Sequence, residues 1–219
     1  MVSTTKKIPK TPIKFSVNLN EEQRLAKEEI LKNKVTFLKG KAGSGKSLLA
    51  VQTALDCLFK KQVDKIYITR PAVDAGESYG YLPGDKNSKM APYTDAIYDN
   101  MYTAYNKEKV DKEIRDGRIV VVPIGHMRGS NFSNAVVIID EAQNVTKPQM
   151  ELILTRLCKG SKMIFVGDSS QIDLTNKKTS GFDLIAQVLS KIDLISTIEL
   201  KTNHRDPIVE EILQELKGL

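Results

Sequence analysis

Short runs of apolar and β-branched residues alternate along this chain with stretches in which apolar residues recur every three to four positions. The first pattern is typical of strands and the second of helices. The expected strands cover residues 35–38, 65–69, 119–123, 135–140, 162–167 and 196–200. The expected helices cover residues 18–33, 46–60, 92–115, 147–158, 181–190 and 206–217. This alternation predicts strands that are joined by helical crossovers.

The strands are short and continuously apolar, as in the run AVVIID at residues 135–140. Such strands are covered on both faces, which is the arrangement of an α/β doubly wound, mostly parallel sheet. We therefore expect a single domain over residues 18–219, preceded by an extended arm over residues 1–17. Sheets of this kind bind ligands beyond the carboxyl ends of their strands. The segment 70–91 is too long for a simple connection and is a further functional candidate.

The composition is that of a globular protein with a basic N-terminal segment. Of the 219 residues, 41% are hydrophobic and 27% are charged, and the formal net charge is +6. Lys6, Lys7, Lys10 and Lys14 all precede the first acid, Glu21. Such an arm suits nucleic acid or another polyanion, or it is a solvated terminus. Neither a membrane-spanning run nor a signal-peptide pattern is found, so we expect a cytoplasmic protein without membrane contact.

The stretch GKAGSGKS, residues 40–47, fits the pattern G-x-x-x-x-G-K-[ST] of a phosphate-binding loop. It follows an expected strand and opens an expected helix, which is the context that the pattern requires. Glycines let backbone N–H groups point at phosphate oxygens, and the helix N-terminus adds its positive end. Lys46 would reach the β- and γ-phosphates, and the Ser47 hydroxyl would ligate Mg²⁺. The nucleotide cradle is expected over Gly40, Lys41, Ala42, Gly43, Ser44, Gly45, Lys46, Ser47 and Leu48.

Acidic and amide side chains follow two further expected strands. Asp140 and Glu141 come at the end of one strand, where Asp140 would hold Mg²⁺ through water and Glu141 would polarise the attacking water. Asp168 and Gln171 follow the next strand, and Gln171 could hydrogen-bond the γ-phosphate or that water. Together with the phosphate-binding loop, these residues predict hydrolysis of a nucleoside triphosphate.

Negative charge on the transferred phosphoryl group favours an arginine nearby. The candidates are Arg70, directly after a strand, Arg128 and Arg205 in loops, and Arg156 on an expected helix. The helical position of Arg156 is more typical of a surface charge. The two histidines lack the spacing of a metal site.

These motifs resemble those of the PhoH family of P-loop ATPases, which look like the first motor domain of superfamily-one helicases. The resemblance covers residues 19–215 and is most specific over Thr69–Asp85 and Ile138–Leu174. Members of that family occur in bacteria and phages and are often linked to phosphate starvation. The resemblance implies a helicase-motor-like fold, Mg²⁺ as cofactor and ATP as substrate.

The resemblance also implies roles for single residues. Lys46 and Ser47 match the family's phosphate-binding and Mg²⁺-binding pair. Asp140 and Glu141 match its metal-side acid and its catalytic acid. On this basis Lys46 and Glu141 are catalytic, whereas Ser47 and Asp140 hold the metal.

Four further residues are assigned by the same resemblance. They are the adenine-reading Gln23, the γ-phosphate sensor Gln171, the phosphate-facing Arg205, and Arg128 of the motif MRG. The segments MRGSNF and TNHRDP depart from the commoner family forms. These departures leave open the nucleic-acid affinity near Arg128 and whether Arg205 acts within its own chain.

The expected partners are other copies of the chain and single-stranded RNA or DNA. A helicase motor binds ATP between two similar domains, whereas this chain has room for one. We therefore expect a ring, for instance of six copies, in which Arg70 or Arg128 reaches a neighbour's ATP. Tyrosines among lysines between residues 79 and 105 could stack bases. Three of them, Tyr98, Tyr102 and Tyr105, recur at helical spacing, which favours core or interface packing.

Two other functions stay open. One is a nucleotide-dependent switch that is not a motor. The other is a thymidine-kinase-like nucleoside kinase, which also combines a phosphate-binding loop with a DEAQ strand end. Such kinases usually carry a four-cysteine zinc site, but the only cysteines here are Cys57 and Cys158. Both lie in apolar helical patterns typical of buried, reduced thiols, and Gln171 and Arg205 fit hydrolysis better.

Overall fold

The computed structural model describes residues 13–71 and 86–216, with side chains described except at residues 86–94, 210, 213 and 214. The strands are β1 (Val35–Gly40), β2 (Lys65–Thr69), β3 (Ile119–Val121), β4 (Ala135–Ile139), β5 (Lys162–Gly167) and β6 (Ile195–Leu200). They form one sheet in the order β3-β2-β4-β5-β1-β6, in which every pair of neighbours is parallel. The expected α/β fold with a mostly parallel sheet is therefore confirmed.

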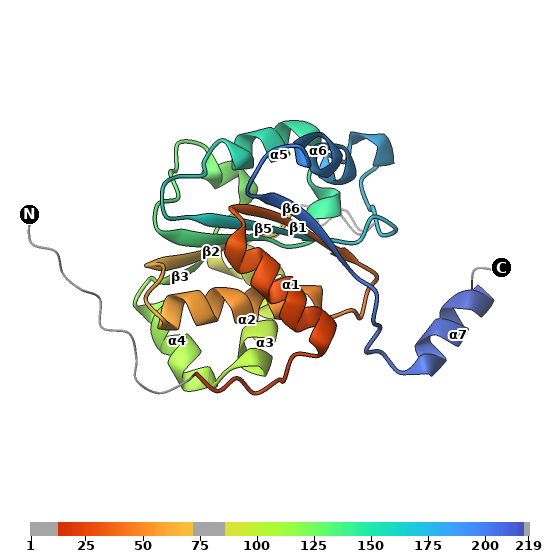
Figure 1. Ribbon diagram of the computed structural model, residues 1–219, viewed down its shortest axis with the longest axis horizontal. Coiled ribbons are helices and arrows are strands. Elements are labelled where there is room, and N and C mark those ends of the chain that lie inside the picture. Colours follow the sequence, from red (N-terminus) through yellow and green to blue (C-terminus); the bar gives the residue numbers. More distant parts are fainter. Residues whose placement is uncertain (1–12, 72–85, 217–219) are drawn as a thin grey trace, which may run out of the picture.

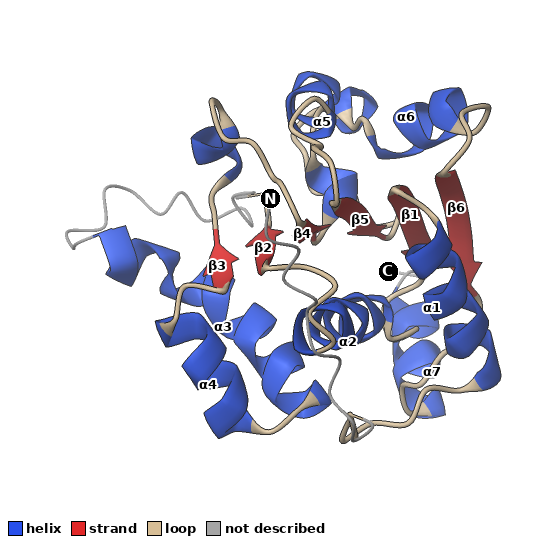
Figure 2. Cartoon of the chain, turned by 60° about the vertical axis from the view of Figure 1, so that its left-hand side comes forward, coloured by secondary structure: helices blue, strands red, loops and turns tan. Residues whose placement is uncertain are grey.

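Helices cover both faces of this sheet, as Figures 1 and 2 show. The α-helices are α1 (Glu21–Lys32), α2 (Lys46–Phe59), α3 (Lys86–Ala104), α4 (Lys107–Arg115), α5 (Lys147–Leu154), α6 (Phe182–Leu189) and α7 (Pro207–Leu216). The short 3-10 helices are η1 (Ile124–Met127), η2 (Ala142–Asn144) and η3 (Lys177–Thr179). Across residues 13–71 and 86–216, every helix is too short or too polar to cross a bilayer.

The side chains of the strands divide into two cores because successive residues of a strand point to opposite faces. Leu38 of β1 and Ile138 of β4 pack among α1, α2, α3 and α4. Phe37 and Ile139, one residue away, pack among α5, α6 and η1. Phe37 also stacks on Phe165 of β5, with ring centroids 5.0 Å apart. The sheet is thus buried on both faces, as its continuously apolar strands predict.

The single helix expected over residues 92–115 was wrong. The structure has two helices, α3 and α4, and α3 begins at Lys86, inside the segment expected to be a loop. The break follows from Asn106, whose side chain accepts a hydrogen bond from the Lys109 N–H and so caps α4. Asn favours this capping position because its side chain satisfies an otherwise unpaired helical N–H group.

The N-terminal segment contacts the domain from residue 15 onward. The Phe15 ring lies edge-on to Tyr105 at 5.6 Å, and the Ser16 N–H donates to the Ala104 carbonyl. The Val17 carbonyl accepts from Gln52. Of the four lysines in the expected arm, Lys6, Lys7 and Lys10 lie outside the described residues. The boundary between arm and domain at residue 17 stays a prediction.

Strand order determines where the loops meet. Because all strands are parallel, the segments that follow β1, β2, β4, β5 and β6 emerge at the same edge of the sheet. β5 lies between β1 and β4, and β6 flanks β1 on its other side. The segment after β1 is thereby surrounded by the segments after β4, β5 and β6.

Candidate functional site

A cleft of about 390 Å³ opens at the carboxyl edge of the sheet. The loop after β1 and the start of α2 contribute Ala42, Gly43, Gly45, Lys46, Ser47 and Leu48 to its lining. The segments after β4, β5 and β6 contribute Asp140, Glu141, Gln171 and Arg205, among others. Most of the site residues predicted from the sequence are therefore brought to one place. The volume lies within the range of about 300–1,000 Å³ that is usual for small-ligand sites.

The loop before α2 depends on glycine at two positions. Gly43 and Gly45 have φ values of +87° and +80°, which side chains rarely allow. A Cβ atom on Gly43 would lie 2.5 Å from Asn203 Oδ1 and 2.6 Å from Arg205 Cγ. The Gly43 carbonyl also accepts a hydrogen bond from the His204 N–H. The loop is therefore packed closely against the segment that joins β6 to α7.

Lys46 lies at the start of α2, with its ammonium group in the cleft. Its Nζ donates to the carbonyl of Lys41 at 2.8 Å. Burial lowers the pKa of Lys46, while the carboxylates of Asp168, Glu141 and Asp140 act in the opposite direction. The lysine thus lies within electrostatic reach of the acids that follow β4 and β5.

Ser47 and Asp140 form a direct pair across the cleft. Ser47 Oγ donates to Asp140 Oδ1 at 2.8 Å. Asp140 is 7% exposed, and burial raises its pKa, with a further contribution from the charge of Glu141. A divalent cation would offset this cost, and Mg²⁺ prefers hydroxyl and carboxylate oxygens. The pair therefore fits the predicted metal.

Glu141 has an unusual backbone conformation, with φ +50° and ψ +42°. This left-handed region is costly for residues other than glycine and recurs at functional sites. Two contacts hold the carboxylate of Glu141, one from Arg70 at 3.3 Å and one from Gln143 Nε2 at 2.7 Å. Glu141 is thereby fixed beside Asp140 with its side chain partly exposed to the cleft.

Gln143 connects the ends of β4 and β5 and was not predicted as a site residue. Besides Glu141, its Nε2 donates to the Gln171 carbonyl at 3.0 Å, and its Oε1 accepts from the Asp168 N–H at 3.1 Å. Asp168 in turn accepts from the Ala42 N–H at 2.9 Å. The sequence signal was present in the stretch DEAQN. Only the folded chain shows that this buried amide joins the segments after β4 and β5, and that Asp168 links them to the loop after β1.

Gln23 lies behind the phosphate-binding loop and does not line the cleft. It belongs to a capping box at the start of α1, in which its backbone N–H donates to Asn20 and its side chain accepts from the Asn20 N–H. Its Nε2 lies 3.3 Å from both the Ser44 carbonyl and His204 Nε2. The amide that was predicted to read adenine is thus engaged in the fold itself.

The predicted arginines occupy different places. Arg205 lines the cleft, and Arg70 follows β2 and pairs with Glu141. Arg128 is exposed at the end of η1, after the edge strand β3, and is absent from the cleft lining. Arg156 lies in a turn beyond α5, which ends at Leu154, so its expected helical position was wrong. One chain by itself brings Arg205 and Arg70, but not Arg128, to the acids.

A family comparison agrees with these motifs. The model of the PhoH-like protein family matches residues 17–217, nearly the whole chain. The chain belongs to the PhoH-like protein family. The expected resemblance to this family is thus confirmed.

Two bacterial relatives show what share of the length of related proteins this PhoH-like chain covers. It is 43% identical over 185 residues to a PhoH-like protein of Bacillus subtilis, covering 84% of this chain and 58% of that protein. It is 40% identical over 194 residues to a PhoH-like protein of Synechocystis, covering 88% of this chain and 59% of that protein. The chain therefore spans less than two thirds of the length of these relatives.

A solved structure with a similar fold is the SWI2/SNF2 ATPase core of Sulfolobus solfataricus in complex with dsDNA. The TM-score is 0.51, with 13% sequence identity over 86% of this chain and 46% of that one. This likeness concerns the fold alone. It confirms the expected helicase-motor-like α/β domain.

Asn100 of α3 lines the cleft of this PhoH-like chain and had no sequence signal, since it lies within a helical stretch rich in tyrosine. It also lines a small adjoining cavity in which Ser47 and Asp140 are the other polar residues. Its Nδ2 donates to the Ala96 carbonyl at 2.9 Å, and among the described side chains no donor to its amide oxygen is found. Asn100 thus joins the side of the cleft that carries the Ser47–Asp140 pair.

The tyrosines at helical spacing pack within the protein, as expected. Tyr105 lies between Phe15 and Phe59, and the Tyr102 hydroxyl donates to Asp111 at 2.7 Å. The Lys107 ammonium lies 5.0 Å from the Tyr102 ring. The other tyrosines of the predicted stacking surface lie outside the residues whose side chains are described.

Proposed function

We propose that this PhoH-like chain is a magnesium-dependent ATPase that hydrolyses ATP to ADP and phosphate. The observation that carries the proposal is a single cleft lined by the phosphate-binding loop with Lys46, the hydrogen-bonded pair Ser47–Asp140, and Glu141. Nucleotide, metal and water would thus each meet a group of the required chemistry. The helicase-motor-like fold is consistent with this class of reaction.

The phosphates would lie along the loop between Gly40 and Lys46. Backbone N–H groups of this loop and the N-terminus of α2 favour negative charge there. Lys46, which is partly desolvated, would bind the β- and γ-phosphate oxygens more strongly than an exposed lysine. Gln171 and Arg205 line the cleft and would contact the γ-phosphate.

Ser47 and Asp140 would hold the metal, Asp140 through a bound water. A metal held by these residues would supply positive charge that offsets the negative charge of the phosphates. Glu141 would accept the proton of the attacking water, and its fixed conformation suits that task. Arg70 would hold the Glu141 carboxylate in position through their ion pair.

For Gln23, we propose a role in reading the adenine edge that requires an exchange of partners. Its Nε2 would leave His204 or the Ser44 carbonyl, both at 3.3 Å, when a base binds. The contact with the Ser44 carbonyl is long for an N–H···O hydrogen bond, so little energy would be lost in its exchange.

We also propose that copies of the chain associate so that Arg128 of one copy reaches the ATP of another. Arg128 is exposed and does not line the cleft of its own chain. An arginine supplied by another copy can raise the rate of hydrolysis by about 10³–10⁵-fold. A head-to-tail arrangement of this kind closes naturally into a ring. The whole protein in longer relatives offers further surface for such contacts.

Single-stranded RNA or DNA is the proposed partner of the motor. The net charge of +6, concentrated in the N-terminal lysines, supports this choice. If nucleic acid is coupled to hydrolysis, single-stranded RNA or DNA raises the ATPase rate at low salt and loses this effect as salt increases. A rate that is insensitive to both polymers at every salt concentration would contradict the coupling.

The central experiment measures products of ATP turnover. We expect free phosphate and ADP from the wild-type chain, no ATP binding by Lys46→Ala, and normal binding with turnover reduced at least about 100-fold in Glu141→Gln. Thymidine is included in a parallel reaction. Phosphate transferred to thymidine would establish the nucleoside kinase instead, and ATP binding without any turnover would favour the switch.

A further inference from the structure

Large apolar side chains are exposed in two places on this molecule, apart from Leu25 on α1. One is α7, where Ile208, Ile212 and Leu216 are each at least half exposed. The other is α6 with the turn that follows it, where Leu184, Val188, Ile192 and Leu194 are between 49% and 58% exposed. Both groups are drawn from the residues whose side chains the structure describes. Concentrated exposure of this kind marks an interaction surface.

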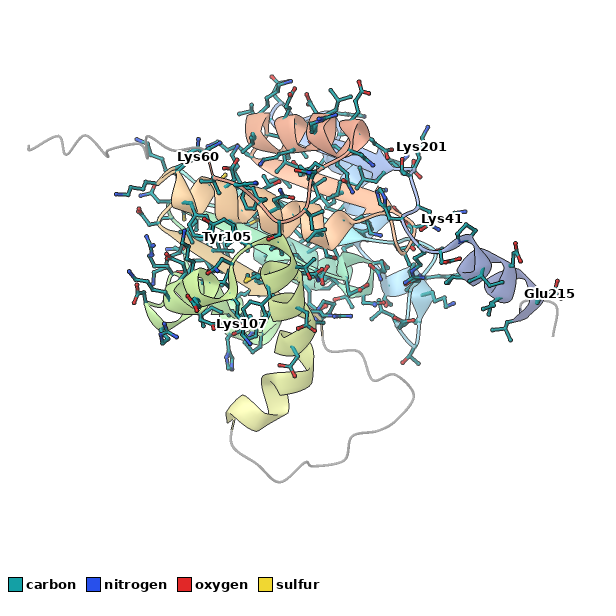
Figure 3. All side chains as sticks on the ribbon, turned by 90° about the horizontal axis from the view of Figure 1, so that it is seen from below. Lys41, Lys60, Tyr105, Lys107, Lys201 and Glu215 are labelled. Carbon is teal, nitrogen blue, oxygen red and sulfur yellow. The ribbon has the colours of Figure 1, made fainter. Side chains whose placement is uncertain are left out.

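The apolar residues of α7 form one stripe, since they recur every four positions along the helix. α7 extends away from the body in Figure 1, and Figure 3 shows Glu215 near its outer end. None of its described side chains is buried. A ten-residue helix of this length is marginal in water without tertiary contacts. The helix therefore requires a partner for its apolar stripe.

α6 differs from α7, because it packs on the sheet and carries apolar residues on two faces. Phe182, Ile185 and Ala186 are buried against the sheet. Leu184 and Val188 point away from that contact and are exposed. A helix with apolar residues all round is normally covered on all sides. Its outward face, continued by Ile192, is thus a second apolar stripe without a partner among the described residues.

The charges around the two stripes are complementary. The described charged residues of α7 are Glu211 and Glu215, both exposed acids. Lys177 and Lys178 precede α6 and Lys191 follows it, and all three are exposed. Of the acids near α6, Asp183 is paired with Lys39, and Asp193 lies in the following turn. Opposite charges at the rim of an apolar contact favour this pairing over contact between two copies of the same stripe.

We propose that α7 of one copy packs its apolar stripe on the outward face of α6 of a second copy. This inference deepens the assembly suggested under the proposed function and rests on it. Because the two surfaces differ, the contact is head-to-tail, and its repetition about a rotation axis would give a closed ring. In such a ring every copy makes the contact twice, once with each of its two neighbours.

The contact would also reach the cleft. Arg205 lies directly before α7 in the segment that packs on Gly43. Docking of α7 on a neighbour restrains this segment and hence the position of the Arg205 side chain in the cleft. Assembly and nucleotide binding would therefore be coupled through the connection between β6 and α7.

The test uses two variants that each disrupt one stripe and one matched control. Ile212→Glu disrupts α7 and Val188→Glu disrupts the outward face of α6. Leu25→Glu makes the same chemical change at an equally exposed site, 58%, outside both stripes. Light scattering during size-exclusion chromatography should give a multimeric mass for the wild-type chain and for Leu25→Glu. Both stripe variants should give the single-chain mass of 24.4 kDa.

Mixing the two stripe variants gives the decisive result. Ile212→Glu retains an intact α6 surface and Val188→Glu retains an intact α7, so the mixture should form pairs of one copy each and nothing larger. A second measurement avoids dependence on folding: Ile212→Cys and Val188→Cys, mixed under mild oxidation, should form a disulfide-linked pair between the two variants.

Three outcomes would overturn the inference: a wild-type chain of single-chain mass, dissociation by Leu25→Glu, or a mixture without pairs. Binding of ATP is measured on the same samples. Retained ATP binding in single-chain variants leaves the proposed nucleotide site intact, whichever way the assembly result falls. Loss of ATP binding in the wild-type chain itself contradicts the proposed function separately.

Discussion

At the scale of single residues, the cleft combines desolvated charges of both signs. Asp140 is buried with its pKa raised by burial, and Lys46 is partly buried with its pKa lowered by burial. Neither charge is neutralised by a short ion pair between the two, since Lys46 donates to a backbone carbonyl and Asp140 accepts from Ser47. Groups held in this way favour ligands of opposite charge, a phosphate for the lysine and a cation for the acid.

The first prediction concerns Asn100, the amide beside the metal-side pair. We expect Asn100→Ala to raise the Mg²⁺ concentration needed for half-maximal nucleotide binding about tenfold, because the proposed metal site would lose a neighbouring polar group. The measurement is a Mg²⁺ titration of fluorescent ADP binding. Binding in EDTA should not change, and Asn106→Ala, at the cap of α4 and outside the cleft lining, serves as control. An unaltered Mg²⁺ titration would assign Asn100 to packing alone.

The second prediction concerns the buried thiol of Cys57. Burial raises its pKa from 9.0 to about 11. Between pH 9 and 11 the unfolded chain therefore loses a proton that the folded chain retains, so stability decreases as pH rises, by up to about 1.4 kcal/mol per pH unit. Urea unfolding across this range should show a smaller slope with pH for Cys57→Ala. If the unfolding free energy depends on pH equally in the wild-type and Cys57→Ala proteins, the Cys57 thiol does not have the raised pKa expected from burial.

At the scale of elements, the site depends on contacts between segments far apart in the sequence. The loop before α2 touches the connection from β6 to α7, and Glu22 of α1 accepts hydrogen bonds from the N–H groups of Lys201 and Thr202 in the same connection. These hydrogen bonds lower the pKa of Glu22. The connection that carries Arg205 is therefore held by both α1 and the phosphate-binding loop.

The third prediction tests this contact with two glycines of positive φ. Gly43→Ala should weaken ATP binding about tenfold, because the new Cβ must displace Asn203 and Arg205. Gly117→Ala introduces the same left-handed strain, φ +65°, but meets nothing within 4 Å. Gly117→Ala should therefore lose about 1 kcal/mol of stability and no ATP affinity. Isothermal titration with ATP, together with thermal unfolding, measures both quantities.

At the scale of the whole molecule, a single parallel sheet gathers five segments at one edge, while the edge strand β3 carries Arg128 away from that point. The geometry thus separates two groups of basic residues. Arg205 lines the cleft of its own chain and Arg70 pairs with Glu141 there, whereas Arg128 does not line the cleft and, under the proposed function, would act on a neighbouring copy.

The fourth prediction distinguishes these groups by mixing inactive proteins. Arg128→Ala and Lys46→Ala should each be inactive, and their equal mixture should regain about a quarter of the activity, since half of the copies have an intact lysine and half of their neighbours an intact arginine. Arg70→Ala mixed with Lys46→Ala should stay inactive, because Arg70 contacts Glu141 in its own chain. Phosphate release measures both mixtures. Equal recovery of activity in the two mixtures would contradict the different roles proposed for Arg128 and Arg70.

Much of the fold could be predicted because its causes are local. Continuous apolar strands require burial on both faces, and the glycines before Lys46 permit a loop that few other sequences form. The end of α3 and the start of α4 were missed, since a capping asparagine within a periodic stretch is a weak local signal. The cleft-lining Asn100 was also missed, because its distance from Ser47 in the chain carries no information about contact.

The sequence by itself determined the class of fold, the order of the strands along the chain, and which residues are candidates for phosphate and metal binding, because these follow from periodicity and from residue type. Only the tertiary structure decided which of these residues meet. It engaged Gln23 in a capping box, kept Arg128 out of the cleft, and left α6 and α7 with apolar faces exposed. The physical reason is that strand order in the sheet, which no local pattern specifies, determines which loops become neighbours.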